Sequence, residues 1–535
     1  MVYLHGGRLT MSSKMQRFPL NLTRWGIPKG ENRDSPPWVQ AETCFLRSIK
    51  TRKPSRALQR EWLTKILFSI GLACCSIPAW SANLVDVYQQ ALTSDPVYQE
   101  AIDQSLATKE NVPISIASLF PNINAQAIPS ITRQGFAGTN LQVDASTGAP
   151  LTPRNNTERA YSLSLNISQT VFDFAKFSQV KGAVATSKSA DATLNAALQT
   201  LMIRVSSAYF AVLRDEDNLN YSEASKRAFA QQLDQVKQQY DVGLKTLTEV
   251  YTAEASYESA VAAYIAAEAT LANDRENLRV ITGQYYPVLS QLSEAFPLIT
   301  PNPANVDTWV MKAERQNWSI KASQYSVDAA RQTIRQQFAG HLPTVNVQGT
   351  VNRLYENNIN SYVALTSRGG PGTETNRSVT LNINVPLFSG GGVAAATNQA
   401  SYNYQAAEKQ LEQSIRNTIN STRQSYNNVI AGISQVRADQ QAIKSNISSL
   451  QGMEASYQVG TTTLVDVLNQ REKLFQAQTQ YATDRYAYVN NILALKQAAG
   501  TLSFDDLRAI NAWLNNTKLR PLHPDHIKPA SSYSK

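Results

Sequence analysis

Hydrophobic and polar residues alternate strictly in four short stretches of the chain. These stretches are residues 122–127, 161–168, 344–348 and 379–385. In the second of them, Leu163, Leu165 and Ile167 alternate with serines and an asparagine. Successive side chains of a strand point to opposite faces, so the pattern predicts four strands, each with one apolar and one polar face.

Long stretches rich in Ala, Gln, Glu and Lys follow the second strand of each pair, at residues 175–239 and 393–456. Neither contains proline, and at about 1.5 Å per residue each predicts a helix of roughly 100 Å. A glycine-containing turn and a second helix of about 35 residues follow in both cases. A shorter helix precedes each strand pair, over about residues 84–118 and 306–339.

The same elements recur in the same order at an offset of about 217 residues, which is the sign of an internal repeat. Residues 240–243 (Tyr-Asp-Val-Gly) return as residues 457–460 (Tyr-Gln-Val-Gly). We therefore expect two structural repeats, at 82–288 and 289–500, followed by a C-terminal equatorial segment and polar tail at 501–535.

An export signal is expected ahead of the first repeat. Arg60 and Lys65 precede an apolar run at residues 66–75, and small residues follow it. This is the order of a secretory signal peptide, and the run is too short to span a bilayer. We assign the signal to 58–81, with cleavage after Ser81, and 1–57 to a non-native N-terminal extension. A short buried apolar helix is the alternative interpretation of the run.

The charge of the chain agrees with this division. The formal net charge is +9, and the whole excess lies in residues 1–60. The neutral remainder has no basic groove of the kind that binds nucleic acid, so we expect no nucleic-acid partner. All three cysteines, Cys44, Cys74 and Cys75, lie in or before the signal, and the mature chain needs no disulfide.

Four amphipathic strands per chain predict an oligomer in a membrane. A strand of about nine to eleven residues with one apolar face is typical of outer-membrane barrels, which close only from about eight strands upward. Two chains would give eight strands and three would give twelve, and only twelve leave room for a water-filled lumen. A soluble β-sandwich with helical insertions would alternate in the same way but does not explain helices of this length.

The motifs and their order resemble the TolC family of outer-membrane efflux and export channels. Both halves carry Tyr-x-Val-Gly-x-x-x-Leu-x-[Asp/Glu]-Val, and residues 281–287 (Ile-Thr-Gly-Gln-Tyr-Tyr-Pro) and 453–457 (Met-Glu-Ala-Ser-Tyr) add to the likeness. Each motif alone is weak. Their order and spacing over residues 83–514 make the resemblance specific.

The resemblance implies an α+β membrane protein that assembles as a homotrimer. Its 12-stranded β-barrel, with four strands per chain, would lie in outer-membrane lipid and continue into a long α-helical barrel in the periplasm. The channel would dock through a periplasmic adaptor (membrane-fusion) protein onto an inner-membrane efflux pump or ABC transporter. Drugs or type I secreted proteins would pass through it, and the channel would need no cofactor and catalyse no reaction.

The resemblance also implies a periplasmic gate. Asp466 matches the first aspartate of the family's entrance, and Tyr457 matches a tyrosine that bonds across to the neighbouring helix pair, where Thr248 and Glu249 stand. We expect Asp466 to make the entrance prefer cations. A solvated helix position is the alternative for Asp466 and Glu249.

Two gate positions depart from the family. Thr462 stands where the family has an arginine, and Asn469 stands where it has a second aspartate. The first change removes a charge-assisted link, so closure should depend more on Tyr457 with Glu249 and on packing. The second leaves one acidic ring, with Asn469 a neutral donor and acceptor.

The helix tips are the expected site of adaptor docking. Gly243 and Gly460 occupy the two turns, where a residue without Cβ permits a left-handed conformation. Val242 and Val459 precede them and complete the predicted docking tips.

Two other classes of function were weighed. An enzyme is disfavoured, because the sequence offers no nucleophile–His–Asp set, phosphate loop or metal-ligand cluster. A periplasmic coiled-coil adaptor or scaffold protein is the stronger alternative, because it would also carry long helices rich in Ala and Gln.

Overall fold

The computed structural model describes residues 81–135, 142–143, 150–151, 155–293, 295–358 and 372–515. All of them fall within one compact unit that begins at Ala79. The predicted extension at 1–57, the signal up to residue 80 and the tail beyond residue 515 lie outside the described residues. The assignment of these segments stays a prediction.

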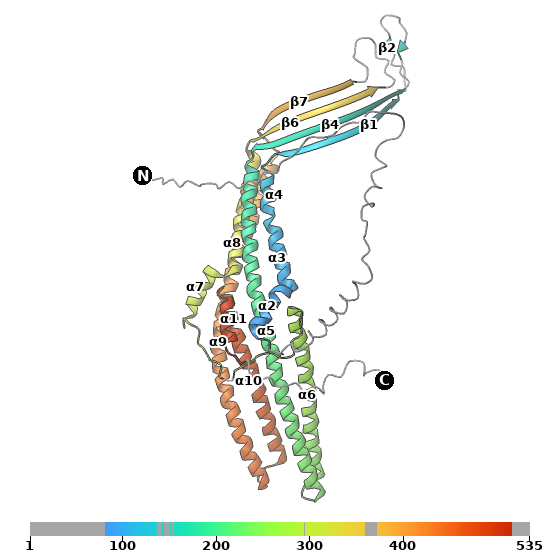
Figure 1. Cartoon of the computed structure of the whole chain (residues 1–535). Helices are drawn as coiled ribbons and strands as arrows, with labels where there is room; N and C mark the ends of the chain where they lie inside the picture. Colours follow the sequence, from blue (N-terminus) through green and yellow to red (C-terminus); the bar gives the residue numbers. More distant parts are fainter. Residues whose placement is uncertain are drawn as a thin grey trace, which may run out of the picture. The chain divides into compact units, whose positions relative to one another are not determined.

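Two very long helices run through this unit (Figure 1). Helix α5 spans Phe174–Asp241 and α9 spans Gly392–Gln458, which are 68 and 67 residues. Asp173 caps α5 by accepting bonds from the backbone N–H groups of Ala175 and Lys176. The predicted windows are therefore single uninterrupted helices without proline, and each ends just before its glycine turn.

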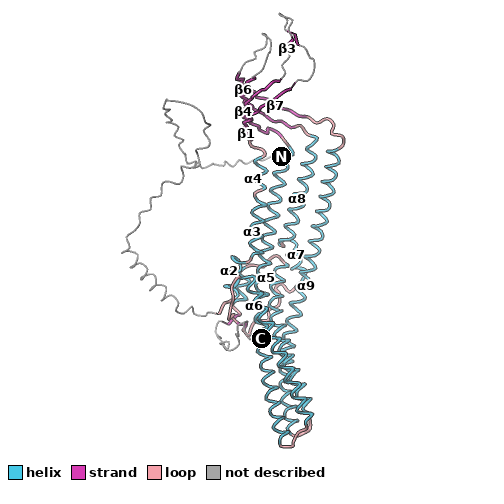
Figure 2. Tube along the Cα trace, turned by 90° about the vertical axis from the view of Figure 1, so that its right-hand side faces the viewer, coloured by secondary structure: helices cyan, strands magenta, loops and turns pink. Residues whose placement is uncertain are grey.

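Each long helix turns back into a shorter one. Helix α6 spans Leu247–Thr282 and packs along α5, and α10 spans Leu464–Ala498 and packs along α9. These two helical hairpins lie together at the end of the unit farthest from the strands, as Figure 2 also shows.

The shorter helices before the strands are broken, whereas the sequence predicted one continuous helix in each half. The first is divided into α2 (Leu84–Ser94), α3 (Pro96–Lys109) and α4 (Asn111–Ala117). The second is divided into α7 (Val306–Gln316) and α8 (Trp318–Phe338), and ends in the 3-10 turn η1 (Ala339–His341).

Polar caps explain two of these breaks, the one between α2 and α3 and the one between α7 and α8. Asp95, which is followed by Pro96, accepts a bond from the N–H of Tyr98, and Asn317 accepts bonds from Ser319 and Ile320. Asp and Asn compete for backbone donors in this way, so they start new helices inside a helical pattern.

The four predicted strands form one antiparallel sheet in the order β1-β4-β6-β7. They are β1 (Asn122–Gly135), β4 (Asn155–Phe172), β6 (Thr344–Asn358) and β7 (Gly372–Asn384), which makes them longer than predicted. Leu165 stands opposite Ala125 on one side and Val351 on the other, so apolar residues share one face and polar residues the other. Among the described residues no helix covers either face, and β7 is exposed throughout.

Short elements complete the unit. Strands β2 (Gln142–Val143) and β3 (Pro150–Leu151) pair in the loop between β1 and β4. Strand β5 (Gln291–Leu292) pairs with β8 (Leu514–Asn515), which follows α11 (Phe504–Asn511).

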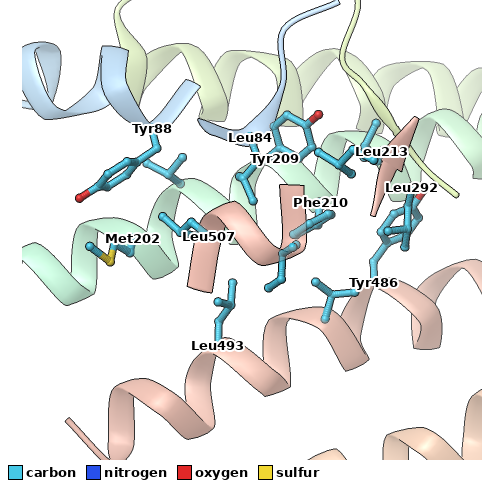
Figure 3. Close-up of a cluster of buried hydrophobic side chains, with 14 of the residues drawn as sticks. Leu84, Tyr88, Met202, Tyr209, Phe210, Leu213, Leu292, Tyr486, Leu493 and Leu507 are labelled. Atoms are coloured by element: carbon cyan, nitrogen blue, oxygen red, sulfur yellow. The ribbon is translucent and has the colours of Figure 1, made fainter. Parts of the chain in front are cut away.

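The main hydrophobic core lies where these short elements meet the long helices (Figure 3). Tyr209 and Phe210 of α5 are fully buried there, and the ring of Phe210 stacks on that of Tyr486 from α10 at 6.0 Å. Leu84 of α2 and Leu507 of α11 close the cluster. This core fixes the level from which the two hairpins extend toward their tips.

Candidate functional site

The two hairpin tips carry the residues predicted to form the gate and the docking site. Gly243 and Gly460 adopt φ values of 78° and 79°, so both turns use the left-handed region. Val242 and Val459 beside them are exposed. The tips therefore present small apolar surfaces on glycine turns, although their role in docking stays a prediction.

The first tip contains a neutralised carboxylate. Glu249 closes a capping box with Thr246, and its other oxygen accepts a bond from the Lys245 ammonium at 3.0 Å. The backbone N–H of Thr246, more than the lysine, lowers the pKa of Glu249 below its usual value. Thr248, next to it, is exposed.

The second tip repeats the capping box without the cation. Asp466 accepts bonds from the hydroxyl and the N–H of Thr463, which lower its pKa. Among the described residues it forms no ion pair, and its side chain is exposed at the start of α10. Asp466 therefore presents a full negative charge at this tip.

Tyr457 reaches the neighbouring hairpin, as the resemblance implied, but it meets Lys245 there. The Lys245 ammonium lies 4.4 Å from the centre of the Tyr457 ring, within range of a cation–π contact. Proximity to Tyr457, followed by the pair with Glu249, raises the pKa of Lys245. The buried Tyr457 hydroxyl has no hydrogen-bond partner in the described part of the chain.

The two departures from the family pattern lie close to these contacts. Thr462 is half-buried beside the second turn. Asn469 is exposed and lines a groove of about 1060 Å³ between α6 and α10. Thr248 lines the same groove from the other hairpin, so the structure brings these two predicted gate residues to one surface.

Arg471 is a link that sequence reasoning missed. Its Nη1 donates to the backbone carbonyl of Ala228 in α5 at 2.9 Å, and its Nη2 lies 2.5 Å from the carboxylate of Glu454 in α9. The side chain is only 15% exposed. One guanidinium thus joins α10 to α9 and to the other hairpin, a task that suits its planar fork of donors.

The spacing of Arg471 from two buried leucines of α10 is a sequence signal for its position. It stands seven residues after Leu464 and three after Leu468, which are both buried against α5 and α6. These intervals place all three residues on one helix face. An arginine on an apolar face needs an acceptor, but nothing in the sequence identifies Ala228 as that acceptor.

A second layer of ion pairs lies nearer the core. Four consecutive charged residues of α5 begin at Arg214, which pairs with Asp274 of α6 at 3.2 Å. Glu216 pairs with Arg275 of α6 at 3.0 Å. Asp217 accepts a bond from Arg485 of α10 at 2.6 Å. This layer ties both shorter helices to α5.

Two facing carboxyl groups lie between α9 and α10. Burial, and then the nearby Asp484 carboxyl group, raises the pKa of Asp439 to about 6. The Nε2 of Gln480 donates to Asp484 at 2.9 Å. Because the Asp484 carboxylate repels a second negative charge beside it, Asp439 binds a proton more readily than it would alone.

The described residues contain no group of three His, Cys, Asp or Glu side chains that could hold a metal ion. The polar residues of the tips instead form caps, ion pairs and the lining of open grooves.

Comparison with known proteins agrees with this geometry. The family described as outer membrane efflux protein matches residues 87–284 and 309–501. The outer membrane protein TolC of Vibrio cholerae is 35% identical over 457 residues, which are 85% of this chain and 99% of that protein. The alkaline protease secretion protein AprF of Pseudomonas aeruginosa is 26% identical over 448 residues, covering 83% and 90% of the two chains.

Solved structures agree on the fold. The chain matches the crystal structure of CusC with a TM-score of 0.66 at 18% identity, over 78% of this chain and 92% of that one. It matches the outer membrane protein VceC of Vibrio cholerae with a TM-score of 0.62 at 20% identity, over 78% and 96%. The predicted resemblance is confirmed: the chain belongs to the outer membrane efflux protein family and is a TolC-like channel of the outer membrane, with a helical part in the periplasm.

Proposed function

We propose that three copies of this chain assemble into one conduit. The observation that carries this proposal is the sheet, which has two different faces, both uncovered, and two edge strands, β1 and β7, without outer partners among the described residues. Open edges are not tolerated in lipid. Three sheets joined edge to edge give a 12-stranded barrel with a polar lumen, which continues through α3, α4, α5, α8 and α9 into a barrel of α5, α6, α9 and α10.

The mature chain in this proposal begins after Ser81 and consists of two repeats, 82–288 and 289–500. The matched lengths of α5 and α9, and of α6 and α10, support the repeat. The segment from residue 501 onward would then be an addition to the second repeat, packed at the level of the core.

The conduit serves inner-membrane transporters in this proposal. A periplasmic adaptor protein would bind the hairpin tips at Gly243 and Gly460 and connect the channel to an efflux pump or ABC transporter. The similarity to a protein named for secretion of alkaline protease supports export of proteins as well as drugs. The family's members are transporters, which supports the prediction that the chain is not an enzyme, and nothing favours the adaptor alternative.

The hairpin tips form the gate of the conduit. The α9–α10 hairpin is held to α5 and α6 by Arg471, by the contact of Tyr457 with Lys245, and by the apolar cluster around Leu464. Opening the entrance would separate these contacts. Asp466 would then line the mouth as a ring of three carboxylates.

Electrophysiology tests the proposal directly. Exported wild-type protein should run as a heat-resistant trimer in outer-membrane fractions and conduct ions in planar bilayers. A deletion strain should become sensitive to drugs, lose secretion of an exported protein, or both. A soluble periplasmic product without conductance would refute the channel.

A further inference from the structure

At the end of the sheet that carries the loops, the arginines and the glutamates lie on different faces. Tyr161 stands opposite Tyr355, and Leu163 stands opposite Arg353, so these residues share the apolar face. The same register places four arginines on that face, one on each strand: Arg133, Arg159, Arg353 and Arg377. Glu356 and Glu374 fall on the polar face instead.

These four residues, here named the arginine band, lie near the ends of the strands that carry the loops. Arg133 is two residues from the end of β1, and Arg377 is five residues from the start of β7. The opposite end of the sheet leads into the helices, since β4 ends at Phe172 and α5 begins at Phe174. The arginine band therefore lies at the end remote from the periplasmic helices.

In the described part of the chain, the arginine band is exposed and has no protein counter-ion. All four side chains are exposed, and none pairs with a carboxylate among the described residues. Arg353 faces Thr375, so Arg377 is its diagonal neighbour. Diagonal neighbours of a sheet have their Cα atoms about 7–8 Å apart, so two long arginine side chains there can approach and repel each other unless an anion lies between them.

Two of the arginines line a small cavity beside an aromatic pair. Arg353 and Arg377 enclose a cavity of about 320 Å³ together with the side chains Leu163, Leu165, Val351 and Thr375. The rings of Tyr161 and Tyr355, on the same face, are 6.2 Å apart. Aromatic residues of this kind mark the level where hydrocarbon meets headgroups.

We propose that the arginine band binds the phosphate groups of a phosphorylated glycolipid, lipid A, in the outer leaflet of the membrane. This inference rests on the proposed function, because it requires the apolar face to meet lipid. The arginine stems cover apolar surface while their forks reach outward to bind phosphate with two parallel hydrogen bonds. The carboxylates on the other face then line the lumen, where they cannot repel the lipid.

Binding of lipid A to the assembled full-length channel tests the proposal. The probes are nanodiscs that contain either lipid A with both phosphates or the same lipid after enzymatic dephosphorylation. Wild-type channel should prefer the phosphorylated lipid, and Arg353→Gln/Arg377→Gln should weaken binding by about thirtyfold, at roughly 1 kcal/mol for each arginine. The lysine pair Arg353→Lys/Arg377→Lys should fall between the two, since it keeps charge but loses the fork.

The matched control is Arg279→Gln/Arg416→Gln, which removes two exposed arginines from α6 and α9. It should bind lipid A like wild type. Equal binding of both lipids, equal loss in the control, or full competition by inorganic phosphate would each overturn the proposal. Conductance measurements distinguish the two hypotheses. A wild-type channel that conducts ions but does not prefer phosphorylated lipid would refute this inference alone. A wild-type protein that does not conduct would refute the proposed function.

Discussion

The two helical hairpins are built alike and charged differently. Both end in a glycine turn with nearly equal φ, and both shorter helices begin with a threonine that forms a capping box with a carboxylate. In the α5–α6 hairpin, Lys245 neutralises that carboxylate. In the α9–α10 hairpin, Thr462 stands at the matching position and Asp466 keeps its charge.

The hairpins also differ further from their tips. Arg471 of α10 reaches across to α5, whereas Glu254 stands at the matching position of α6. Asp439 faces Asp484 in the second hairpin, where Ser222 and an alanine match them in the first. The two hairpins thus share their backbone geometry and differ in a few charged side chains. In the second hairpin, Arg471 binds the other hairpin, two facing carboxyl groups repel each other, and Asp466 keeps a charge that ions can reach.

The largest expected difference concerns the glycines that end α6 and α10. Gly283 and Gly500 both have left-handed φ, but a Cβ on Gly283 would lie 3.6 Å from Ser94, whereas one on Gly500 would lie 2.6 Å from backbone of Asn317. Gly500→Ala should therefore cost about 3 kcal/mol or more, and Gly283→Ala about 1 kcal/mol. Loss of helical circular dichroism on heating measures both, and equal unfolding temperatures would contradict the comparison.

Removing the link between the hairpins should have the next largest effect. Arg471→Gln should cost about 2 kcal/mol per chain and raise the open fraction of the channel, because a shielded charge-assisted bond is lost. The matched control is Lys473→Gln, which removes an exposed charge from the same helix. Single-channel recordings give the measurement.

Glu454 provides an internal check on the same link. If Arg471 acts partly through Glu454, Arg471→Gln/Glu454→Gln should open the channel no more than Arg471→Gln does. Additive effects of the two changes, or a wild-type open fraction in Arg471→Gln, would show that the two hairpins are held together by other contacts.

The strands and the long helices could be predicted from the sequence, but the polar contacts that cap and join the helices could not. Strand faces follow from period-two alternation, and the uninterrupted course of α5 and α9 follows from the absence of proline. The breaks at Asp95 and Asn317 were missed, because a capping side chain resembles any polar helix residue until its backbone partner is known. Arg471 and Ala228 are 243 residues apart, so only the packing of the hairpins brings them together.

The facing carboxyl groups of the second hairpin predict a dependence on pH. Folding raises the pKa of Asp439 to about 6, so the folded chain holds this proton more tightly than the unfolded chain. The resulting stabilisation is complete below the unfolded value and is lost as pH rises through about 6. Solvent screens the pair, so we expect less than about 1 kcal/mol.

Asp439→Asn tests this dependence. The variant should be at least as stable as wild type at pH 7 and should lose the part of the pH dependence that the pair contributes. Glu216 and Asp274, whose pKa values burial also raises, contribute equally in both proteins. Asp328→Asn, an exposed change on α8, is the control. Unfolding temperatures between pH 4 and pH 7 that fall in parallel for wild type and Asp439→Asn would refute a contribution of Asp439 to the pH dependence.

Substitutions of the carboxylates at the hairpin tips should have the smallest effect on structure. They should have the most specific effect on ion transport. Asp466→Asn keeps a side-chain oxygen that can accept from the backbone N–H of Thr463 in the capping box and removes only the charge, so helicity should not change. Because the charges of Lys245 and Glu249 already cancel, the double change Lys245→Gln/Glu249→Gln should alter ion selectivity less than Asp466→Asn does. Reversal potentials and block by divalent cations in planar bilayers measure both. Equal effects of the two variants would mean that the charge difference between the hairpin tips does not act on permeating ions.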